Sequence, residues 1–288
     1  MKPARFEYQA PETLAEALAL LGAEPSAVPI AGGQSLMPVL NFRLATPALL
    51  VDLRRLPGLR GIAIGQDGVR LGARVTWRDI ETDPRLAAAH PLLREAVSHV
   101  AHYQIRNRGT VGGSLAHADP AAELPGIAVA CDAEIIVTGK ESERIIPAAE
   151  FFTGPLSTAL RQGELITQLR LPGWPASRRW AFREFARRHG DFALAGAALF
   201  YDEDADGRAG NAHIAVIGAC SRPHRLPSAE AMLNGRVMDE TAIAAAAKAA
   251  SAEVDPPSDL HADAEYRRAL VGTMVERALR GAMQTGGS

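Results

Sequence analysis

The chain has 288 residues, of which 47% are hydrophobic and 22% are charged, and its formal net charge is -2. These values are ordinary for a globular protein, and the near-neutral charge gives no sign of nucleic-acid or membrane-surface binding. Cys131 and Cys220, the two cysteines, form no C-x-x-C motif, so this chain does not supply the ligands of an iron–sulfur cluster or a four-cysteine zinc site. The sequence shows no apolar signal segment and no run of membrane-spanning length, so we expect a cytoplasmic protein without membrane insertion.

Short strands and helices alternate in the first part of the chain. Thr13 and Glu16 have capping-box spacing and predict a helix that ends near Gly22. Gly65-Gln66-Asp67-Gly68 separates two apolar runs and predicts a β-hairpin. The other elements that we expect here are strands over 6–8, 28–31 and 49–53, a short helix capped by Thr76, and a helix over 92–101.

Two glycine-containing stretches interrupt these elements. The first is Ala31-Gly32-Gly33-Gln34-Ser35, and the second, from Gln104 to Pro120, contains Thr110-Val111-Gly112-Gly113-Ser114. Glycines leave backbone amides uncovered, and a concave run of amides binds anions. We therefore interpret the stretches as two loops that hold a diphosphate, most simply that of a dinucleotide, between them.

A helix is predicted directly after the second stretch, with Asp119 as its N-cap, Pro120 at its first position and Cys131 at its end. Pro125 falls inside this helix and is expected to shorten or bend it. The helix N-terminus adds a partial positive charge beside the anion site. No G-x-G-x-x-G motif follows a strand, which disfavours a Rossmann nicotinamide site.

Several polar residues of the second stretch have two interpretations. Thr110 and Ser114 could donate their hydroxyl groups to the ligand or bond locally within the loop. Arg106 and Arg108 could neutralise phosphate or brace the loop through backbone carbonyls. His117 could lie near the ligand or bond to the backbone.

The rest of the sequence divides at 171–175. Before this segment we expect a hairpin over 133–138 and 144–146 and a strand over 165–171. After it we expect a meander of strands over 180–186, 193–201 and 212–217, and then helices over 228–233, 241–254 and 264–283. Residues 285–288 are expected to be disordered. The predicted fold class is α+β, with two domains over 1–175 and 176–288.

The two glycine stretches, together with Ala118-Asp119-Pro120-Ala121-Ala122-Glu123, resemble the FAD-binding medium subunit of the molybdenum hydroxylases, the family of the xanthine dehydrogenase and carbon monoxide dehydrogenase flavoproteins. Arg183 and the run from Arg187 to Ala193 resemble the C-terminal motif of the same family. The resemblance covers nearly the whole chain. It implies an FAD-binding domain of the vanillyl-alcohol oxidase/p-cresol methylhydroxylase type, followed by a smaller C-terminal domain of antiparallel sheet plus helices.

The resemblance also implies cofactors and partners. FAD is expected in this chain, while a small subunit carries iron–sulfur clusters and a large subunit carries molybdenum on a molybdopterin-type cofactor. The complex is expected to be a dimer of heterotrimers. The cysteine count agrees with this division, because the electrons that reach this chain must come from clusters held elsewhere.

The two stretches define the cofactor-binding residues that we expect: Ala31, Gly32, Gly33, Gln34, Ser35, Asn107, Thr110, Gly112, Gly113 and Ser114. The resemblance adds Glu123, as a carboxylate near the ribityl or flavin group, and Arg183, as a cation that stabilises the reduced flavin. The alternative for Arg183 is a solvated strand arginine. Phe192 either lies beside the flavin ring or packs in the core.

These expectations predict an electron-transfer subunit whose own side chains perform no acid–base chemistry on the organic substrate, and which holds no metal. The complex is expected to hydroxylate an N-heterocycle or a related small molecule. One alternative is the medium subunit of a carbon monoxide dehydrogenase, for which we expect histidine at the position of Gln34. Another is a stand-alone FAD-dependent oxidoreductase that acts directly on its substrate.

Overall fold

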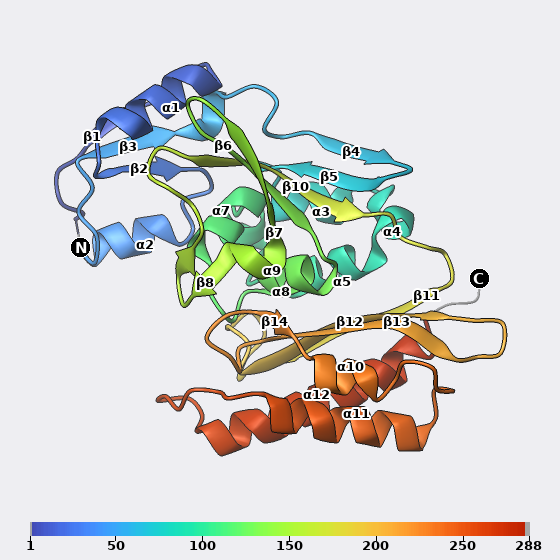
Figure 1. Ribbon diagram of the computed structural model, residues 1–288. Coiled ribbons are helices and arrows are strands. Elements are labelled where there is room, and N and C mark those ends of the chain that lie inside the picture. The colour runs from blue at the N-terminus through green and yellow to red at the C-terminus, as the bar shows by residue number, and fades with distance from the viewer. Residues whose placement is uncertain (1, 286–288) are drawn as a thin grey trace.

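A computed structural model of the chain describes residues 2–285. Its layers are seen edge-on in Figure 1: a five-stranded sheet, a layer of helices, a four-stranded sheet and a second layer of helices, with a small three-stranded sheet at one end. None of the helices in the described part of the chain is long and apolar enough to cross a bilayer. The predicted α+β class is confirmed at the level of mixed sheets and helices.

The small sheet has the order β1-β3-β2, and all of its pairs are parallel. Its strands are β1 (Glu7–Gln9), β2 (Ala27–Ile30) and β3 (Leu49–Asp52). Helix α1 (Leu14–Ala23) begins with the predicted capping box of Thr13 and Glu16. Helix α2 (Leu36–Asn41) was not predicted, because Pro38 falls inside it. Pro38 lies in the first turn, where the missing N–H has no partner within the helix in any case.

The five-stranded sheet has the order β4-β5-β10-β6-β7 and is antiparallel throughout. Both predicted hairpins are confirmed. The strands are β4 (Ile62–Gly65), β5 (Gly68–Gly72), β6 (Glu134–Thr138), β7 (Glu143–Pro147) and β10 (Leu165–Pro172), and a separate pair consists of β8 (Phe152–Gly154) and β9 (Ser157–Thr158). One 3-10 turn, η1 (Leu53–Arg55), follows β3.

Seven helices belong to this part of the molecule. They are α3 (Trp77–Thr82), α4 (Leu86–Ala89), α5 (Pro91–His99), α6 (Tyr103–Arg106), α7 (Val111–His117), α8 (Glu123–Ala130) and α9 (Ala148–Phe151). Thr76 caps α3 as predicted, and its partner in the capping box is Asp79. The predicted helix over 92–101 is α5, which ends two residues earlier.

The four-stranded sheet confirms the predicted meander and adds one short strand. Its antiparallel strands are β11 (Arg178–Phe185), β12 (Ala195–Glu203), β13 (Ala209–Ile217) and β14 (His224–Arg225). The predicted helices are confirmed as α10 (Pro227–Ala231), α11 (Glu240–Glu253) and α12 (Ala264–Ala282). The expected disorder is wrong for Thr285, whose hydroxyl group donates to the carbonyl of Trp180 at 2.7 Å. Residues 286–288 lie outside the described residues.

Both faces of the four-stranded sheet are buried. On β11, Phe182 belongs to the core beneath the five-stranded sheet, whereas its neighbour Ala181 belongs to the core formed with α11 and α12. Alternation of side chains along a strand produces this division. Helix α8 lies between the two sheets and contacts both β12 and β13.

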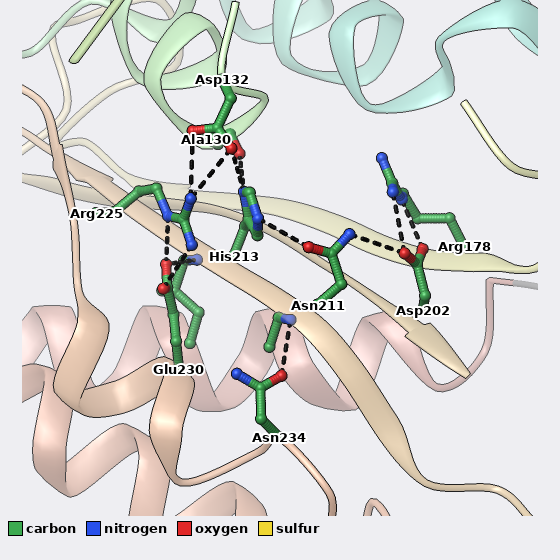
Figure 2. A network of polar contacts seen from close by, with 11 residues as sticks. Ala130, Asp132, Arg178, Asp202, Asn211, His213, Arg225, Glu230 and Asn234 are labelled. Atoms are coloured by element: carbon green, nitrogen blue, oxygen red, sulfur yellow. Dashed lines mark hydrogen bonds and ion pairs between the residues drawn. The ribbon is translucent and has the colours of Figure 1, made fainter. Parts of the chain in front are cut away.

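A polar network fixes the C-terminal end of α8 against the four-stranded sheet (Figure 2). The ring nitrogen Nδ1 of His213 lies 2.7 Å from the carbonyl oxygen of Ala130, and Arg225 bonds both Asp132 and the buried Glu230. Buried polar groups need such partners, and they also fix geometry. The network therefore sets the orientation of α8, whose other end carries Glu123.

Candidate functional site

The first glycine stretch forms a tight turn between β2 and α2. Four consecutive backbone amides, those of Gly32, Gly33, Gln34 and Ser35, donate to no acceptor in residues 2–285. Gly33 has φ +72, a conformation that glycine adopts without strain. The amide group of Gln34 braces the turn by donating to the carbonyl oxygen of Gly32 at 3.1 Å. These consecutive free donors suit an anionic ligand.

The two stretches meet, as the sequence predicted. A Cβ atom on Gly32 would collide with the carbonyl oxygen of Arg108, so this glycine lets the backbones touch. Gly109 is packed in turn against Trp77, because a Cβ atom there would lie 2.6 Å from the indole nitrogen. Ala31 is half-buried at the end of β2 and packs against the small core behind the turn.

The second stretch is not a loop, which corrects our expectation. Most of it forms α6 and α7, and the amides of its paired glycines already have partners within the protein. The amide of Gly112 donates to the carbonyl of Ala73 at 2.8 Å, and the amide of Gly113 donates to the hydroxyl oxygen of Thr110 at 3.2 Å. This stretch therefore offers an approach surface and not a set of free donors.

The small residues of α7 have separate roles. A Cβ atom on the buried Gly112 would lie 2.6 Å from the Cβ of Ala73, so Gly112 permits close packing against the strand end. Gly113 is exposed, and outside the backbone of its own helix the only atom of residues 2–285 within 4 Å of a Cβ atom there would be the Thr110 hydroxyl oxygen, at 2.8 Å. The space above Gly113 is therefore open for a ligand.

The polar residues of the second stretch fall into two groups. Thr110 is only 6% exposed and is the N-cap of α7, which supports the local interpretation of its hydroxyl group. The side chains of Ser114 and Asn107 bond no protein group in the described part of the chain, and that of Asn107 is exposed. Ser114 and Asn107 are therefore free to contact a ligand.

Of the two arginines, one is bonded within the protein and the other is exposed. The guanidinium of Arg106 donates to the carbonyls of Val100 and Ala101 and lies 2.8 Å from a carboxylate oxygen of Glu81, so Arg106 braces the chain. Arg108 is exposed, and its backbone touches Gly32. Arg108 is thus the arginine that can reach an anion at the first turn.

The helix expected at Asp119 begins instead at Glu123. The carboxylate of Asp119 accepts a bond from the amide of Ala121 at 2.9 Å and closes a short turn before the helix. Pro125 is the third residue of α8, where a missing N–H is tolerated. The first residue of the helix is therefore Glu123, and burial, with the Glu184 carboxylate nearby, raises the pKa of Glu123 to about 8.

Arg183 does not join the two stretches, which corrects the expectation from the resemblance. Its side chain lies against α12, where a Cβ atom on Gly281 would be 2.9 Å from its guanidinium, and it donates to the carbonyl of Phe182. The side chain that faces α5 and α8 is that of Glu184, which lies 3.5 Å from Nδ1 of His99. Arg183 is exposed, which supports the alternative of a solvated strand arginine, whereas Glu184 is half-buried. The sequence did not distinguish these two neighbours, because apolar residues occur on both faces of β11.

The loop after β11 presents an aromatic ring to solvent. Phe192 is 63% exposed, so the alternative of core packing is wrong. A Cβ atom on Gly190, which has φ +86, would collide with the ring of His102, and this contact brings the loop next to α6. An exposed phenylalanine beside a candidate ligand site offers a flat apolar surface for stacking.

The arrangement fits a flavin dinucleotide. Free amides and Arg108 supply donors for a diphosphate, open space lies over Gly113, and uncommitted polar side chains are available on Ser114 and Asn107. No acid, base and nucleophile are lined up here as they are in a hydrolase. The site therefore has the features of a cofactor-binding site.

Comparisons with known proteins agree with this geometry. The family model described as FAD binding domain in molybdopterin dehydrogenase matches residues 4–174, and the one described as CO dehydrogenase flavoprotein C-terminal domain matches residues 180–282. The chain is 42% identical to the 6-hydroxypseudooxynicotine dehydrogenase complex subunit alpha of Paenarthrobacter nicotinovorans, over 98% of this chain and 96% of that protein.

Solved structures are similar along the whole chain. The carbon monoxide dehydrogenase from Hydrogenophaga pseudoflava which lacks the Mo-pyranopterin moiety of the molybdenum cofactor has a chain with TM-score 0.96 and 38% identity, and all of both chains is covered. The quinoline 2-oxidoreductase from Pseudomonas putida 86 has a chain with TM-score 0.94 and 39% identity, with 99% of each chain covered.

Proposed function

Since the chain belongs to the FAD-binding medium subunits of the molybdenum hydroxylases, a family of oxidoreductases, we propose that it carries electrons from the iron–sulfur clusters of a partner subunit to an external acceptor. Its FAD supplies the redox chemistry, because a flavin takes up electrons singly and delivers them as a pair. The side chains of this subunit bind the cofactor and control its surroundings. The organic substrate is oxidised at the molybdenum of another subunit.

One observation supports the position of the cofactor above all others. The turn that carries the free amides of Gly32 to Ser35 meets the backbone of Arg108 at Gly32, and the two backbones approach so closely only because Gly32 has no side chain. We propose that these amides and Arg108 bind the diphosphate. Ser114 and Asn107 then contact the remaining polar groups of the FAD, and Glu123 contacts its ribityl or flavin part.

The partners follow from the same family. We propose a small iron–sulfur subunit and a large molybdopterin subunit, assembled as a dimer of heterotrimers in the cytoplasm. The FAD-binding domain is proposed to be of the vanillyl-alcohol oxidase/p-cresol methylhydroxylase type, with the domain boundary between residues 175 and 176.

An N-heterocycle is the substrate class that we propose for the complex. The names of several relatives support this choice, including Nicotine 6-hydroxylase medium subunit and Caffeine dehydrogenase subunit beta. A carbon monoxide dehydrogenase medium chain at 38% identity supports the alternative. The glutamine at position 34, where we expect histidine in carbon monoxide dehydrogenases, favours the heterocycle.

The test is co-expression with the neighbouring subunits, followed by absorption spectroscopy of the purified complex. We expect bound flavin that is bleached by an N-heterocycle such as nicotine or quinoline in the complex, but not in the isolated chain. Bleaching of the isolated chain by a substrate would support the stand-alone oxidoreductase instead, and bleaching of the complex by carbon monoxide would support the other alternative. A complex that contains no flavin contradicts the proposal.

A further inference from the structure

A histidine with a carboxylate at each ring nitrogen lies between α8 and solvent. Nδ1 of His99 is 3.5 Å from an oxygen of Glu184, and Nε2 is 3.8 Å from an oxygen of Glu95. An imidazole in this position takes a proton on one nitrogen and releases another from the opposite one. The two distances are slightly longer than hydrogen bonds, so a small side-chain movement or one bridging water completes each transfer.

The three side chains form a series from the interior to the surface. The Glu184 side chain is 10% exposed, that of His99 is 32% exposed and that of Glu95 is 41% exposed. Glu95 opens on a hollow of about 400 Å³ lined by Arg78, Glu81, Arg94, Ser98 and Trp180. At the inner end, Glu123 begins α8, which packs against α5 and against β12, the strand that pairs with Glu184. The Glu184 charge contributes to the raised pKa of Glu123.

The packing around Glu184 also favours a functional role. One of its carboxylate oxygens is buried and has no hydrogen-bond partner in the described part of the chain. Burying a carboxylate oxygen without a hydrogen-bond partner costs folding free energy, because buried charged groups normally have their hydrogen bonds satisfied. Room for this side chain comes from Gly196, its register partner on β12, where a Cβ atom would lie 3.1 Å from the Cβ of Glu184.

We propose that Glu95, His99, Glu184 and Glu123 form a proton path that connects the flavin site with water in the hollow. The inference rests on the proposed function, because it requires FAD beside Glu123. Two-electron reduction of a flavin takes up one proton. In the path, Glu123 gives up that proton and receives another from Glu184. His99 then protonates Glu184, and Glu95 protonates His99 and takes up a proton from water.

Electrons and protons balance over one cycle of flavin reduction and reoxidation. The two electrons come from the iron–sulfur clusters of the partner subunit, and they leave to the external acceptor. When they leave, the proton returns to Glu123 and then to water along the same residues. No further oxidant or reductant is needed, and each residue of the path regains its starting protonation state.

The pKa values of Glu123 and His99 are both raised, which suits their role in proton transfer. Burial, followed by the Glu184 charge, raises the pKa of Glu123 to about 8, and the Glu184 carboxylate raises the pKa of His99. A group with a pKa near the working pH both holds and releases its proton readily. The charged groups that also face the path are Asp119 before α8 and Arg78, Glu81 and Arg94 around the hollow.

The test uses the assembled complex with its FAD. A photoreduced deazaflavin delivers electrons without any substrate, and a pH-indicator dye in weakly buffered solution follows proton uptake while absorbance follows the flavin. We expect His99→Ala to slow proton uptake by about tenfold or more, and added imidazole to restore the rate. Glu95→Gln, at the exposed end, should slow the same phase. His261→Ala, at an exposed histidine in the connection between α11 and α12, is the matched control and should leave the rate unchanged.

Two results would overturn the path. One is normal proton uptake in both His99→Ala and Glu95→Gln. The other is slowed uptake in His99→Ala that imidazole does not restore, since a structural defect would explain it. Loss of FAD from the wild-type complex is a different result, which contradicts the proposed function itself.

Discussion

Arg183 and Glu184, adjacent in sequence, point to opposite faces of β11. Arg183 packs against Gly281 of α12, whereas Glu184 lies beside His99 of α5. The charge that this strand turns toward α8 is therefore negative and not positive. An electron carrier in that region experiences a field of opposite sign to the one that the family resemblance implied.

This relationship predicts different effects of two neutralising substitutions on the flavin. Glu184→Gln removes a nearby negative charge and should raise the midpoint potential of the bound FAD by about 30 mV, which corresponds to roughly 1.4 kcal/mol for a two-electron couple. Arg183→Gln is the matched control on the other face and should leave the potential unchanged. Spectroelectrochemical titration of the complex measures both. A larger shift of the potential in Arg183→Gln than in Glu184→Gln would mean that the flavin lies on the α12 side of the sheet and not on the α8 side.

The contact between the two glycine stretches is tested by Gly32→Ala. The new methyl group meets the backbone of Arg108, which cannot move away as a side chain can, so we expect a loss of roughly 1–3 kcal/mol in stability and loss of FAD retention. Gly61→Ala is the control, because nothing lies within 4 Å of a Cβ atom there. Urea unfolding and the flavin content of purified protein are the measurements. Equal flavin content in the two variants would contradict the assignment of the turn.

Gly113→Val separates cofactor binding from folding. A Cβ atom at Gly113 meets only the Thr110 hydroxyl, so the substitution should weaken one helix cap, by about 1 kcal/mol, while it blocks the open space above α7. We expect a folded protein that retains no FAD. Thr110→Ala weakens the same cap without filling the space and should keep its flavin. Full flavin occupancy in Gly113→Val would mean that the cofactor approaches elsewhere.

Glu123 predicts a pH dependence of stability in the FAD-free chain. Its pKa is raised from 4.5 to about 8 in the folded protein, so the folded state binds more protons than the unfolded state between these values. Stability therefore falls as pH rises through this window, by at most about 1.4 kcal/mol per pH unit for this group. Glu123→Gln should remove that part of the slope in urea titrations at pH 5, 6.5 and 8. Parallel pH profiles for the two proteins would contradict the burial of an ionisable Glu123.

The network in Figure 2 predicts that removing one of its charges lowers the stability of the protein strongly. Glu230 is 5% exposed and bonds both Arg225 and the amide of Ile214, so Arg225→Met leaves a buried carboxylate without its cationic partner and should cost about 3 kcal/mol in stability. Arg55→Met breaks a pair in which both side chains are exposed and should cost less than about 1 kcal/mol. Urea unfolding compares them. Similar losses in the two variants would show that the buried network does not hold α8 in place.

The sequence by itself determined much of the local structure and the family. Capping boxes at Thr13 and Thr76 marked helix starts, because a cap is decided by residues three positions apart. Hairpins and the C-terminal meander followed from apolar alternation and turn residues. The free amides of the first turn were also expected, because glycines leave backbone amides uncovered and two such stretches occur together.

The tertiary structure decided which groups face the site. Gly112 and Gly113 lie in α7, where the carbonyl of Ala73 and the hydroxyl of Thr110 accept their amides, and the Ala73 contact joins residues distant in sequence. Asp119 closes a turn, so Glu123 begins α8. Neither the choice between Arg183 and Glu184 nor the position of His99 between two carboxylates follows from local pattern. Both depend on how a sheet with two buried faces is oriented against its neighbours, and only long-range packing specifies that orientation.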